Sequence, residues 1–280
     1  MKKFFTMLVT AILFVTCAFG LTACGDNIVV HTNAFFAPFE YYEGTEIVGV
    51  DVDIMNKVGE KMGKKVVFEN KDFGTLIDAV AEGKLCDCSA AGITITDERA
   101  EKVAFSIPYY TSIQYVVFKK GTLETSKNAN NEDVIMWETL ANKKIGVQLD
   151  TTGDIYVGIE INGDGDYVGV LQGTDTVKTP YDSAQLAYEA LKAGSGAIDV
   201  VVVDKLPAQY LIKNDTDEYQ ALPLYYDATT ATSEDYAIAV NKEQTDLLAA
   251  INEVLAELLA TTDANGNNGV EQLVIQHFGV

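Results

Sequence analysis

Few side chains in this sequence can bind a transition metal or form a disulfide. The 280 residues include two histidines, His31 and His277, and four cysteines, of which only Cys86 and Cys88 lie beyond residue 24. With so few ligands we expect no Cys/His metal site, and we expect no other cofactor. We interpret Cys86 and Cys88 as buried free thiols.

Basic residues are also scarce. Twenty Lys and Arg stand against 41 Asp and Glu, which gives a formal charge of −21. A surface of this charge repels nucleic acid and anionic lipid, so we expect neither as a partner. We attribute the acidity itself to solubility.

Motifs of common catalytic sites are absent as well. The sequence has no Gly-x-Ser-x-Gly motif, no Ser/His/Asp arrangement and no Gly-x-x-x-x-Gly-Lys phosphate loop, so we do not expect an enzyme. Residues 162–166 and 263–267 alternate Asn, Asp and Gly like the start of a calcium loop. Neither segment has the full twelve-residue ligand set, and we interpret both as turns.

The N-terminus is organised like an export signal. Lys2 and Lys3 precede an apolar run over residues 4–19, and Leu21-Thr-Ala-Cys24 follows. The run is short for a membrane-spanning helix. The last four residues resemble the lipobox of bacterial lipoproteins, which implies a signal peptide over residues 1–23 and a lipid on Cys24. We therefore expect the rest of the chain outside the cytoplasm, attached to the cell membrane only through this lipid.

After residue 24, short β-branched runs alternate with amphipathic stretches. The runs typical of strands are residues 28–32, 66–69, 145–148 and 200–203. Apolar residues at helical spacing predict helices over residues 54–62, 76–81, 186–191 and 247–259. This alternation favours an α/β fold with largely parallel sheets.

Two extended runs, residues 115–119 and 236–241, indicate that the chain crosses twice between two lobes. The first lobe would comprise residues 24–117 and 236–280, and the second lobe residues 118–235. Each lobe then has an ordinary domain size, and the crossings near residues 118 and 236 would form a hinge.

A series of motifs identifies a family. In the first predicted lobe they are Phe36-Ala-Pro-Phe39, Gly49-Val-Asp-Val-Asp-Ile54, Asp72-Phe-Gly-Thr-Leu76, Gly92-Ile-Thr-Ile-Thr-Asp-Glu-Arg99 and Phe105-Ser-Ile-Pro-Tyr109. In the second they are Gly146-Val-Gln-Leu-Asp-Thr-Thr-Gly153 and Gly196-Ala-Ile-Asp-Val-Val-Val-Val-Asp204. In this order they resemble the polar amino acid-binding proteins of ABC importers (extracellular solute-binding protein family 3), such as the glutamine- and histidine-binding proteins. The resemblance implies a type II periplasmic-binding-protein-like fold and an amino acid ligand between the lobes.

A free amino acid carries a carboxylate and an ammonium group, and removing both from water is costly unless each is paired. Arg99 offers a planar bidentate donor for the carboxylate, and Asp204 an acceptor for the ammonium. The family's aromatic positions fall on Phe36 and Phe73, whose rings would sandwich the ligand side chain. Further hydrogen-bonding groups would come from Gly92, Thr94, Thr151 and Thr152.

Two amides are expected at the side-chain end of the pocket. Asn33 and Gln148 stand where the family's glutamine binder has an acid and a lysine. If both line the pocket, a charged side chain would lose hydration without gaining an ion pair, so we expect a neutral ligand such as glutamine, cysteine, serine or methionine. The alternative is that both amides face solvent.

Asp150 departs from the family pattern, which usually has Gly at this position. It could be the N-cap of the following helix, or it could weaken carboxylate binding by repulsion. Residues 155–177 also form a longer stretch than usual for the family, with a hairpin-like segment over residues 162–168. We interpret Phe39, beside Pro38, as packing.

Two other functions fit the same lobes. The chain could be a ligand-sensing module that feeds a receptor rather than a permease, or a dehydratase-type enzyme. Sensor chains usually continue into a transmembrane helix and a signalling domain, and no catalytic arrangement accompanies the binding motifs. We therefore expect a monomeric binding protein that delivers an amino acid to a permease.

Overall fold

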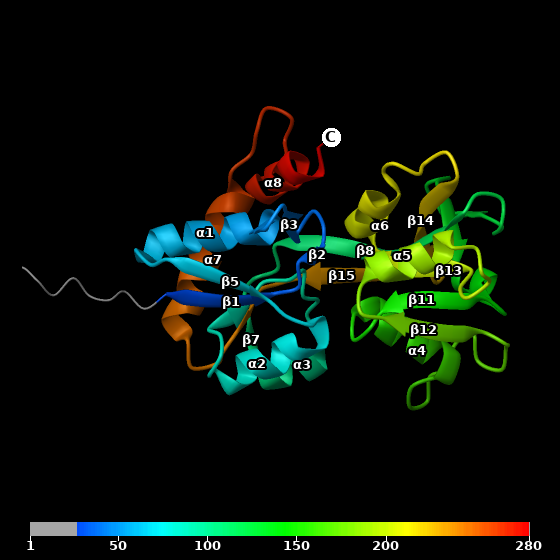
Figure 1. Cartoon of the computed structure of the whole chain (residues 1–280), viewed down its shortest axis with the longest axis horizontal. Coiled ribbons are helices and arrows are strands. Elements are labelled where there is room, and N and C mark those ends of the chain that lie inside the picture. Colours follow the sequence, from blue (N-terminus) through cyan, green and yellow to red (C-terminus); the bar gives the residue numbers. More distant parts are fainter. Residues whose placement is uncertain (1–26, 280) are drawn as a thin grey trace, which may run out of the picture.

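The computed structural model describes residues 27–279 as two sheet-centred halves joined by extended strands (Figure 1). The predicted signal peptide and lipidated Cys24 lie outside the described residues. No helix within residues 27–279 is long and apolar enough to cross a membrane.

The first half is built on a five-stranded sheet of order β5-β1-β6-β16-β7. Its strands are β1 (Ile28–Thr32), β5 (Val66–Asn70), β6 (Cys88–Ser89), β7 (Ala104–Phe105) and β16 (Ala239–Val240). A small separate sheet contains β2 (Phe35–Phe36), β3 (Glu40–Glu43) and β4 (Glu46–Val48). The helices are α1 (Val50–Met62), η1 (Phe73–Thr75), α2 (Leu76–Glu82), α3 (Asp97–Lys102), α7 (Thr245–Ala260) and α8 (Gly269–Phe278).

The second half is built on a sheet of order β12-β11-β13-β8-β14-β10-β9, with β15 paired to β8. Its strands are β8 (Tyr110–Lys119), β9 (Ser126–Lys127), β10 (Asp133–Met136), β11 (Lys144–Gln148), β12 (Val177–Tyr181), β13 (Val200–Asp204), β14 (Tyr219–Tyr225) and β15 (Ser233–Tyr236). The helices are η2 (Trp137–Leu140), α4 (Thr152–Asn162), α5 (Ala184–Lys192) and α6 (Lys205–Ile212).

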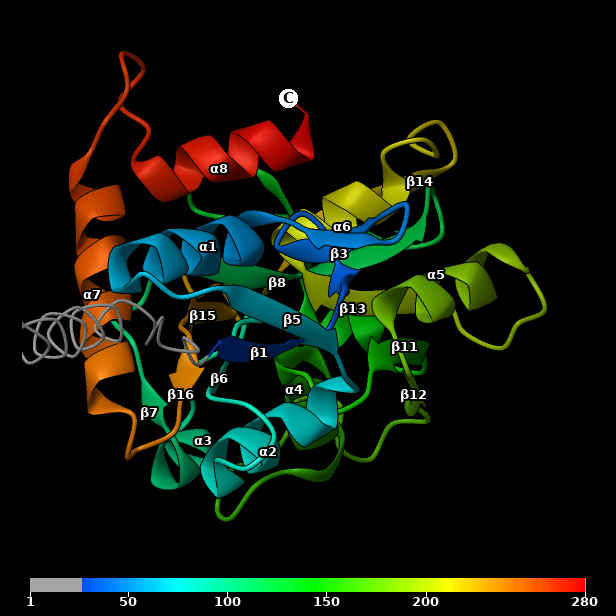
Figure 2. The ribbon, with the colours of Figure 1, turned by 60° about the vertical axis from the view of Figure 1, so that its left-hand side comes forward.

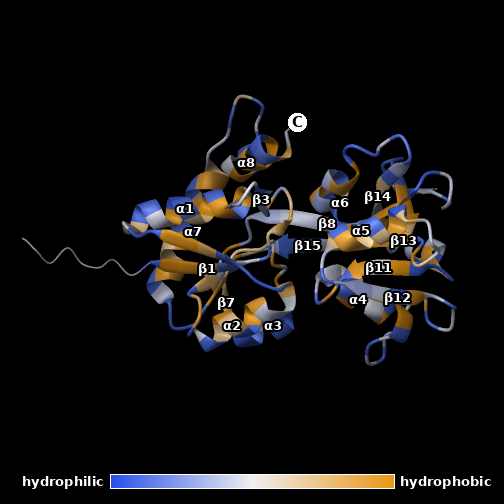
Figure 3. Cartoon of the chain, in the orientation of Figure 1, coloured by the Kyte–Doolittle hydropathy of each residue, from blue (hydrophilic) through white to orange (hydrophobic). Residues whose placement is uncertain are grey.

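Helices cover both faces of each sheet (Figures 1 and 2). In the first half, α1 and α8 lie on one face and α2 with α3 on the other. In the second half, Val201 and Val203 of β13 pack with α5 and α6, whereas Val200 and Val202 pack with α4. Alternate residues of a strand point to opposite faces, so one run of valines serves two cores. Apolar residues accordingly concentrate on the inner strands and on the inward stripes of the helices (Figure 3).

The strands and helices expected from the sequence are present. The four predicted strands correspond to β1, β5, β11 and β13, and the four helical stripes to α1, α2, α5 and α7. The sheets are more mixed than largely parallel, because β8 and β16 run antiparallel to their neighbours. The chain passes from the first half to the second along β8, and it returns to the first sheet with β16.

A two-stranded ribbon connects the halves. Residues 110–113 of β8 pair antiparallel with β15, from Tyr110↔Tyr236 to Ile113↔Ser233. Residues 114–118 of the same strand then pair with β13, inside the second sheet. The paired segments 110–113 and 233–236 are therefore the stretch of β8 and β15 that lies between the two sheets.

The two cysteines are free and buried, as predicted. The two segments that resemble calcium loops form turns. Asp164 and Tyr167 exchange backbone hydrogen bonds, which matches the predicted hairpin-like segment. The Asp263 carboxylate accepts the N–H groups of Asn265 at 2.8 Å and Asn267 at 2.9 Å. No group of three metal-ligating side chains occurs within residues 27–279.

Candidate ligand-binding site

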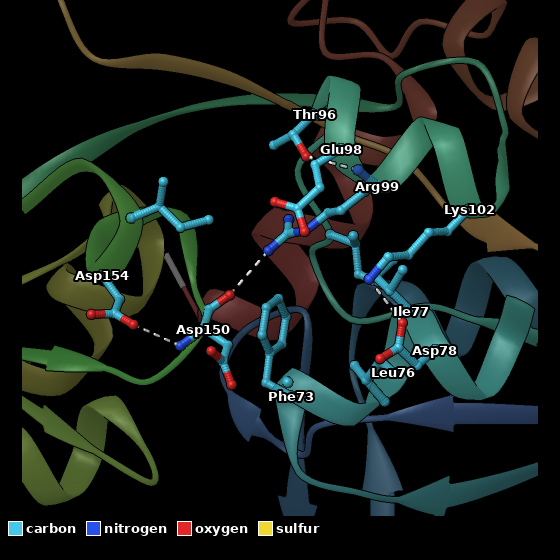
Figure 4. Close-up of a pocket in the computed structure, with 13 residues that line it drawn as sticks. Phe73, Leu76, Ile77, Asp78, Thr96, Glu98, Arg99, Lys102, Asp150 and Asp154 are labelled. Carbon is cyan, nitrogen blue, oxygen red and sulfur yellow. Dashed lines mark hydrogen bonds and ion pairs between the residues drawn. The ribbon is translucent and has the colours of Figure 1, made fainter. Parts of the chain in front are cut away.

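Nine of the ten side chains or backbone positions predicted to bind a ligand line one cavity between the two sheets. They are Asn33, Phe36, Phe73, Gly92, Thr94, Gln148, Thr151, Thr152 and Asp204. The tenth, Arg99, lines a second cavity of about 270 Å³, which shares Phe73 with the first (Figure 4). The inner cavity measures only about 10 Å³, about the space that one water molecule needs. The two halves thus lie close together around this cavity.

Strand ends place these residues. On the first half, Asn33 follows β1, and Gly92 and Thr94 follow β6. On the second half, Gln148 ends β11 and Asp204 ends β13. The carboxyl ends of the parallel strands of both sheets thus face the same gap, which is where α/β sheets usually bind ligands.

Among the described residues, no basic side chain lines the inner cavity, and Arg99 is the basic residue that donates hydrogen bonds to its wall. It lies on α3 and is 8% exposed. Its Nη1 donates to the Thr94 carbonyl at 2.9 Å, its Nη2 to the Asp150 carbonyl at 3.1 Å, and its guanidinium carbon lies 5.5 Å from the centre of the Phe73 ring. Burial lowers the pKa of Arg99, and nearby carboxylates, Glu234 first, oppose this effect. The guanidinium thus spans the gap with two directed donors.

Asp204 lies on the opposite wall with a second acid beside it. Its Oδ1 accepts the Tyr236 hydroxyl at 2.5 Å. Glu234, which the sequence analysis missed, accepts the Thr94 hydroxyl at 2.6 Å and Gln114 Nε2 at 2.6 Å. Glu234 lies two residues before Tyr236 in an extended run, so the two side chains lie on the same face of the strand. This spacing could have indicated that Glu234 faces inward.

Besides the bond from Thr94 to Glu234, three hydrogen bonds join the halves across the cavity. Gln148 Nε2 donates to Asn33 Oδ1 at 3.0 Å, and the Thr152 hydroxyl donates to the Thr94 hydroxyl at 2.8 Å. Arg99 Nη2 supplies the third by donating to the Asp150 carbonyl. Asn33 and Gln148 are 4% and 3% exposed, so the alternative in which both amides face solvent is wrong.

Asp150 occupies a left-handed backbone conformation, with φ of 62°. Only Gly adopts this region freely, and Asp or Asn tolerate it, which accounts for a Gly in the family pattern. The N-cap of α4 is Thr151, whose hydroxyl accepts the N–H of Asp154, so the interpretation of Asp150 as the N-cap is wrong. Instead, the Asp150 N–H donates to Asp154 Oδ2 at 2.9 Å, and its carboxylate packs over Gly74 of the first half.

The wall behind Phe36 depends on Gly92. Gly92 has φ of 53°, and a Cβ there would lie 2.7 Å from the Phe36 ring. Its N–H donates to Asp51 Oδ2 at 2.9 Å, and the Tyr109 hydroxyl donates to Asp51 Oδ1 at 2.6 Å. Burial raises the pKa of Asp51 to about 6, against the effect of these donors. The hydrogen bonds to Asp51 thereby hold the loop that carries Gly92 in place.

Phe39 is a packing residue, as predicted. It is fully buried, and its ring contacts those of Tyr236 at 5.1 Å and Tyr110 at 5.2 Å between centres.

The fold agrees with comparisons to known proteins. The model of the bacterial extracellular solute-binding proteins, family 3, matches residues 28–265. The ABC transporter arginine-binding protein 1 of Escherichia coli is 29% identical over 266 residues, which cover 93% of this chain and 94% of that protein. The probable histidine-binding protein of Neisseria gonorrhoeae is 29% identical, over 82% of this chain and 76% of that protein. The alignment with the arginine-binding extracellular protein ArtP of Bacillus subtilis is 34% identical but spans only 53% of this chain and 56% of that protein.

Solved structures with the same architecture include an ancestral arginine-binding protein, bound in one case to arginine and in another to glutamine. The arginine complex has a TM-score of 0.71 at 30% identity, and covers 90% of this chain and 98% of that one. The glutamine complex has a TM-score of 0.69 at 31% identity, and covers 91% and 98%. The fold is therefore that of the type II amino acid-binding proteins.

Proposed function

The chain belongs to the bacterial extracellular solute-binding proteins of family 3, and we propose that it binds one free amino acid between its two halves and delivers it to an ABC importer. The observation that carries this proposal is the placement of Arg99 and Asp204 on opposite sides of one gap. Each is less than a tenth exposed.

The two charges match the two charges of an amino acid. The ligand carboxylate would take both Arg99 donors, which now bind the carbonyl groups of Thr94 and Asp150. The ligand ammonium would bind the Asp204 oxygen that does not accept from Tyr236. Further donors to the ligand would be the Thr94 hydroxyl and the first N–H groups of α4, which have no acceptor within their own helix.

The side chain of the ligand would lie between the rings of Phe36 and Phe73 and end at Asn33 and Gln148. Those two amides already pair with each other, with the Lys71 carbonyl and with the Ala184 N–H. A ligand amide can replace one of these bonds by an equivalent one, whereas a cationic or anionic group gains no ion pair there. We therefore propose a neutral ligand, and glutamine as the best fit.

Binding would proceed by closure of the two halves, and the second half begins at residue 114 rather than at the expected residue 118, because residues 114–118 of β8 pair with β13 inside the second sheet. The ribbon of residues 110–113 and 233–236 is the candidate hinge, because two paired strands can bend while their hydrogen bonds persist. Ligand entry would break the three bonds between the halves, and ligand contacts would replace them.

We also propose that Cys24 carries a lipid that holds the mature protein on the outer side of the cell membrane. The Leu21-Thr-Ala-Cys24 sequence supports this anchor. The partner would be a permease in the same membrane, which accepts the amino acid from a monomeric binding protein.

A thermal-shift screen of residues 25–280 against the common amino acids tests the function. A specific ligand should raise the melting temperature in proportion to the logarithm of its concentration, and glutamine should rank above arginine and glutamate. Stabilisation by no amino acid would contradict the proposed function. Stabilisation mainly by arginine or glutamate would contradict only the proposed ligand charge.

A further inference from the structure

Glu234 connects three parts of the molecule beneath the ligand cavity. It lies on β15, is 5% exposed, and binds Thr94 of the first half and Gln114 of β8 through its two oxygens. Asp204 of the second half is its neighbour, because Gln114 pairs with Asp204 in the strand register, and Tyr236, two residues further along β15, donates to Asp204 Oδ1. Glu234 therefore contacts both walls of the site and the ribbon between them.

Two carboxyl groups buried side by side do not both ionise readily, and such a pair holds one proton between them. Burial, and then the negative charge of Asp204, raise the pKa of Glu234 well above its usual value. The other ionisable groups that act on the pair are Arg99 of α3, Glu40 of β3, Tyr110 of β8, Tyr156 of α4 and Tyr236 of β15. Burial raises the pKa of the three tyrosines, so they stay neutral, and it also raises the pKa of Glu40. Arg99 is the one positive charge among these groups.

We infer that Glu234 is a further positioning residue of the amino acid site, and that a proton and the ligand ammonium compete for the Asp204–Glu234 pair. This inference rests on the proposed function. Without ligand, the proton bridges the two carboxyl groups. With ligand, the ammonium supplies the positive charge, and the proton leaves to solvent.

The competition fixes the direction of a pH effect. An ammonium next to the pair favours the ionised form of Glu234, so ligand binding lowers the pKa of Glu234. Affinity must then rise as the pH rises, by linkage. An opposite charge a few ångströms away lowers a carboxyl pKa by about 1–3 units, and each unit is a factor of ten in affinity. We expect affinity to increase with pH across the range in which Glu234 loses its proton, by about tenfold for each unit by which the ligand lowers the pKa of Glu234.

Calorimetry with L-glutamine and L-arginine tests the inference, because neither probe changes its own ionisation appreciably in this range. Titrations at one pH in two buffers of different ionisation enthalpy count the protons released. The wild-type protein should release a fraction of one proton per ligand. Glu234→Gln keeps the size of Glu234 and one of its two acceptor oxygens but cannot titrate, so it should release none. Its affinity should match the wild type at low pH and remain constant as the pH rises.

Glu218→Gln is a matched control, because Glu218 is an exposed acid that pairs with Lys119 at 2.6 Å far from the site. It should keep the wild-type pH dependence. A pH dependence that persists in Glu234→Gln would overturn the inference and assign the proton to another acid. If Glu234→Gln does not fold, the wild-type buffer comparison decides alone, and binding without proton release overturns the inference. If neither probe binds the wild type, the amino acid that gave the largest thermal shift replaces them, and the proposed function itself fails only if no amino acid stabilises the protein.

Discussion

Replacing Gly74 by alanine should weaken ligand binding by obstructing the contact between the two halves. Gly74 is exposed on η1, and a Cβ at this position would lie 2.0 Å from Asp150 Oδ2, 2.8 Å from Asp150 Cγ and 3.1 Å from Asp150 Cβ. Rotation of the Asp150 side chain removes the two closest contacts. The contact with Asp150 Cβ remains, so the loop that accepts the Arg99 hydrogen bond must shift.

The size of the effect follows from this geometry. One added methyl group that forces such a shift costs about 1–2 kcal/mol, which corresponds to about a 5- to 30-fold loss of affinity. The cost falls on the closed arrangement alone, because Gly74 is exposed and belongs to no hydrophobic cluster. The melting temperature without ligand should therefore change little.

A double-mutant cycle measured by calorimetry isolates this contact. Asp150→Gly removes every Asp150 atom that the new methyl group meets, and glycine adopts the φ of 62° without strain. Asp150→Gly alone should bind nearly as the wild type does, and it should restore most of the affinity that Gly74→Ala loses. Normal binding by Gly74→Ala, or an equal loss in the double variant, would refute closure through this contact.

Four further variants test the remaining assignments. Arg99→Ala or Asp204→Ala should each lower affinity about a hundredfold or more, because a buried ligand charge loses its partner; near-normal calorimetry for both would remove the charge clamp. Cys24→Ser should move the protein from the membrane fraction to the soluble fraction with ligand binding intact, and unchanged membrane association would contradict the anchor. Asn33→Asp adds a carboxylate at the end of the side-chain pocket and should raise the affinity for arginine relative to glutamine about tenfold; an unchanged ratio in competition calorimetry would show that residue 33 does not contact the ligand side chain.

Much of this fold could be predicted from local sequence patterns, because the spacing of apolar residues shows directly which side chains are buried. The run Val200–Asp204 is fully apolar until its last residue, and it is a central strand with cores on both faces. The stripe over residues 247–259 belongs to α7, whose buried residues all come from that stripe. The antiparallel pairing of β8 was not predicted, because strand direction depends on contacts far along the chain.

The site could be predicted where a side chain fits a known motif, and not where its role depends on backbone conformation or on distant partners. Asp150 looks like a helix cap in sequence, since Asp is a favoured capping residue. Its left-handed φ, set by the turn between β11 and α4, gives that role to Thr151. Glu234 belongs to no motif, and only the meeting of β15, β8 and the end of β13 brings it to Asp204.

The balance of buried charge explains why a neutral side chain suits this site. Glu40 is fully buried beside Asp51, and burial raises its pKa well above the usual value, which favours its neutral form. The same holds for Glu234 while it keeps its proton. Arg99 and Asp204 then remain as one positive and one negative charge at the cavity. A zwitterion with a neutral side chain pairs with both and places no charge beside Asn33 and Gln148, whereas a cationic side chain would add a charge that these two amides cannot neutralise.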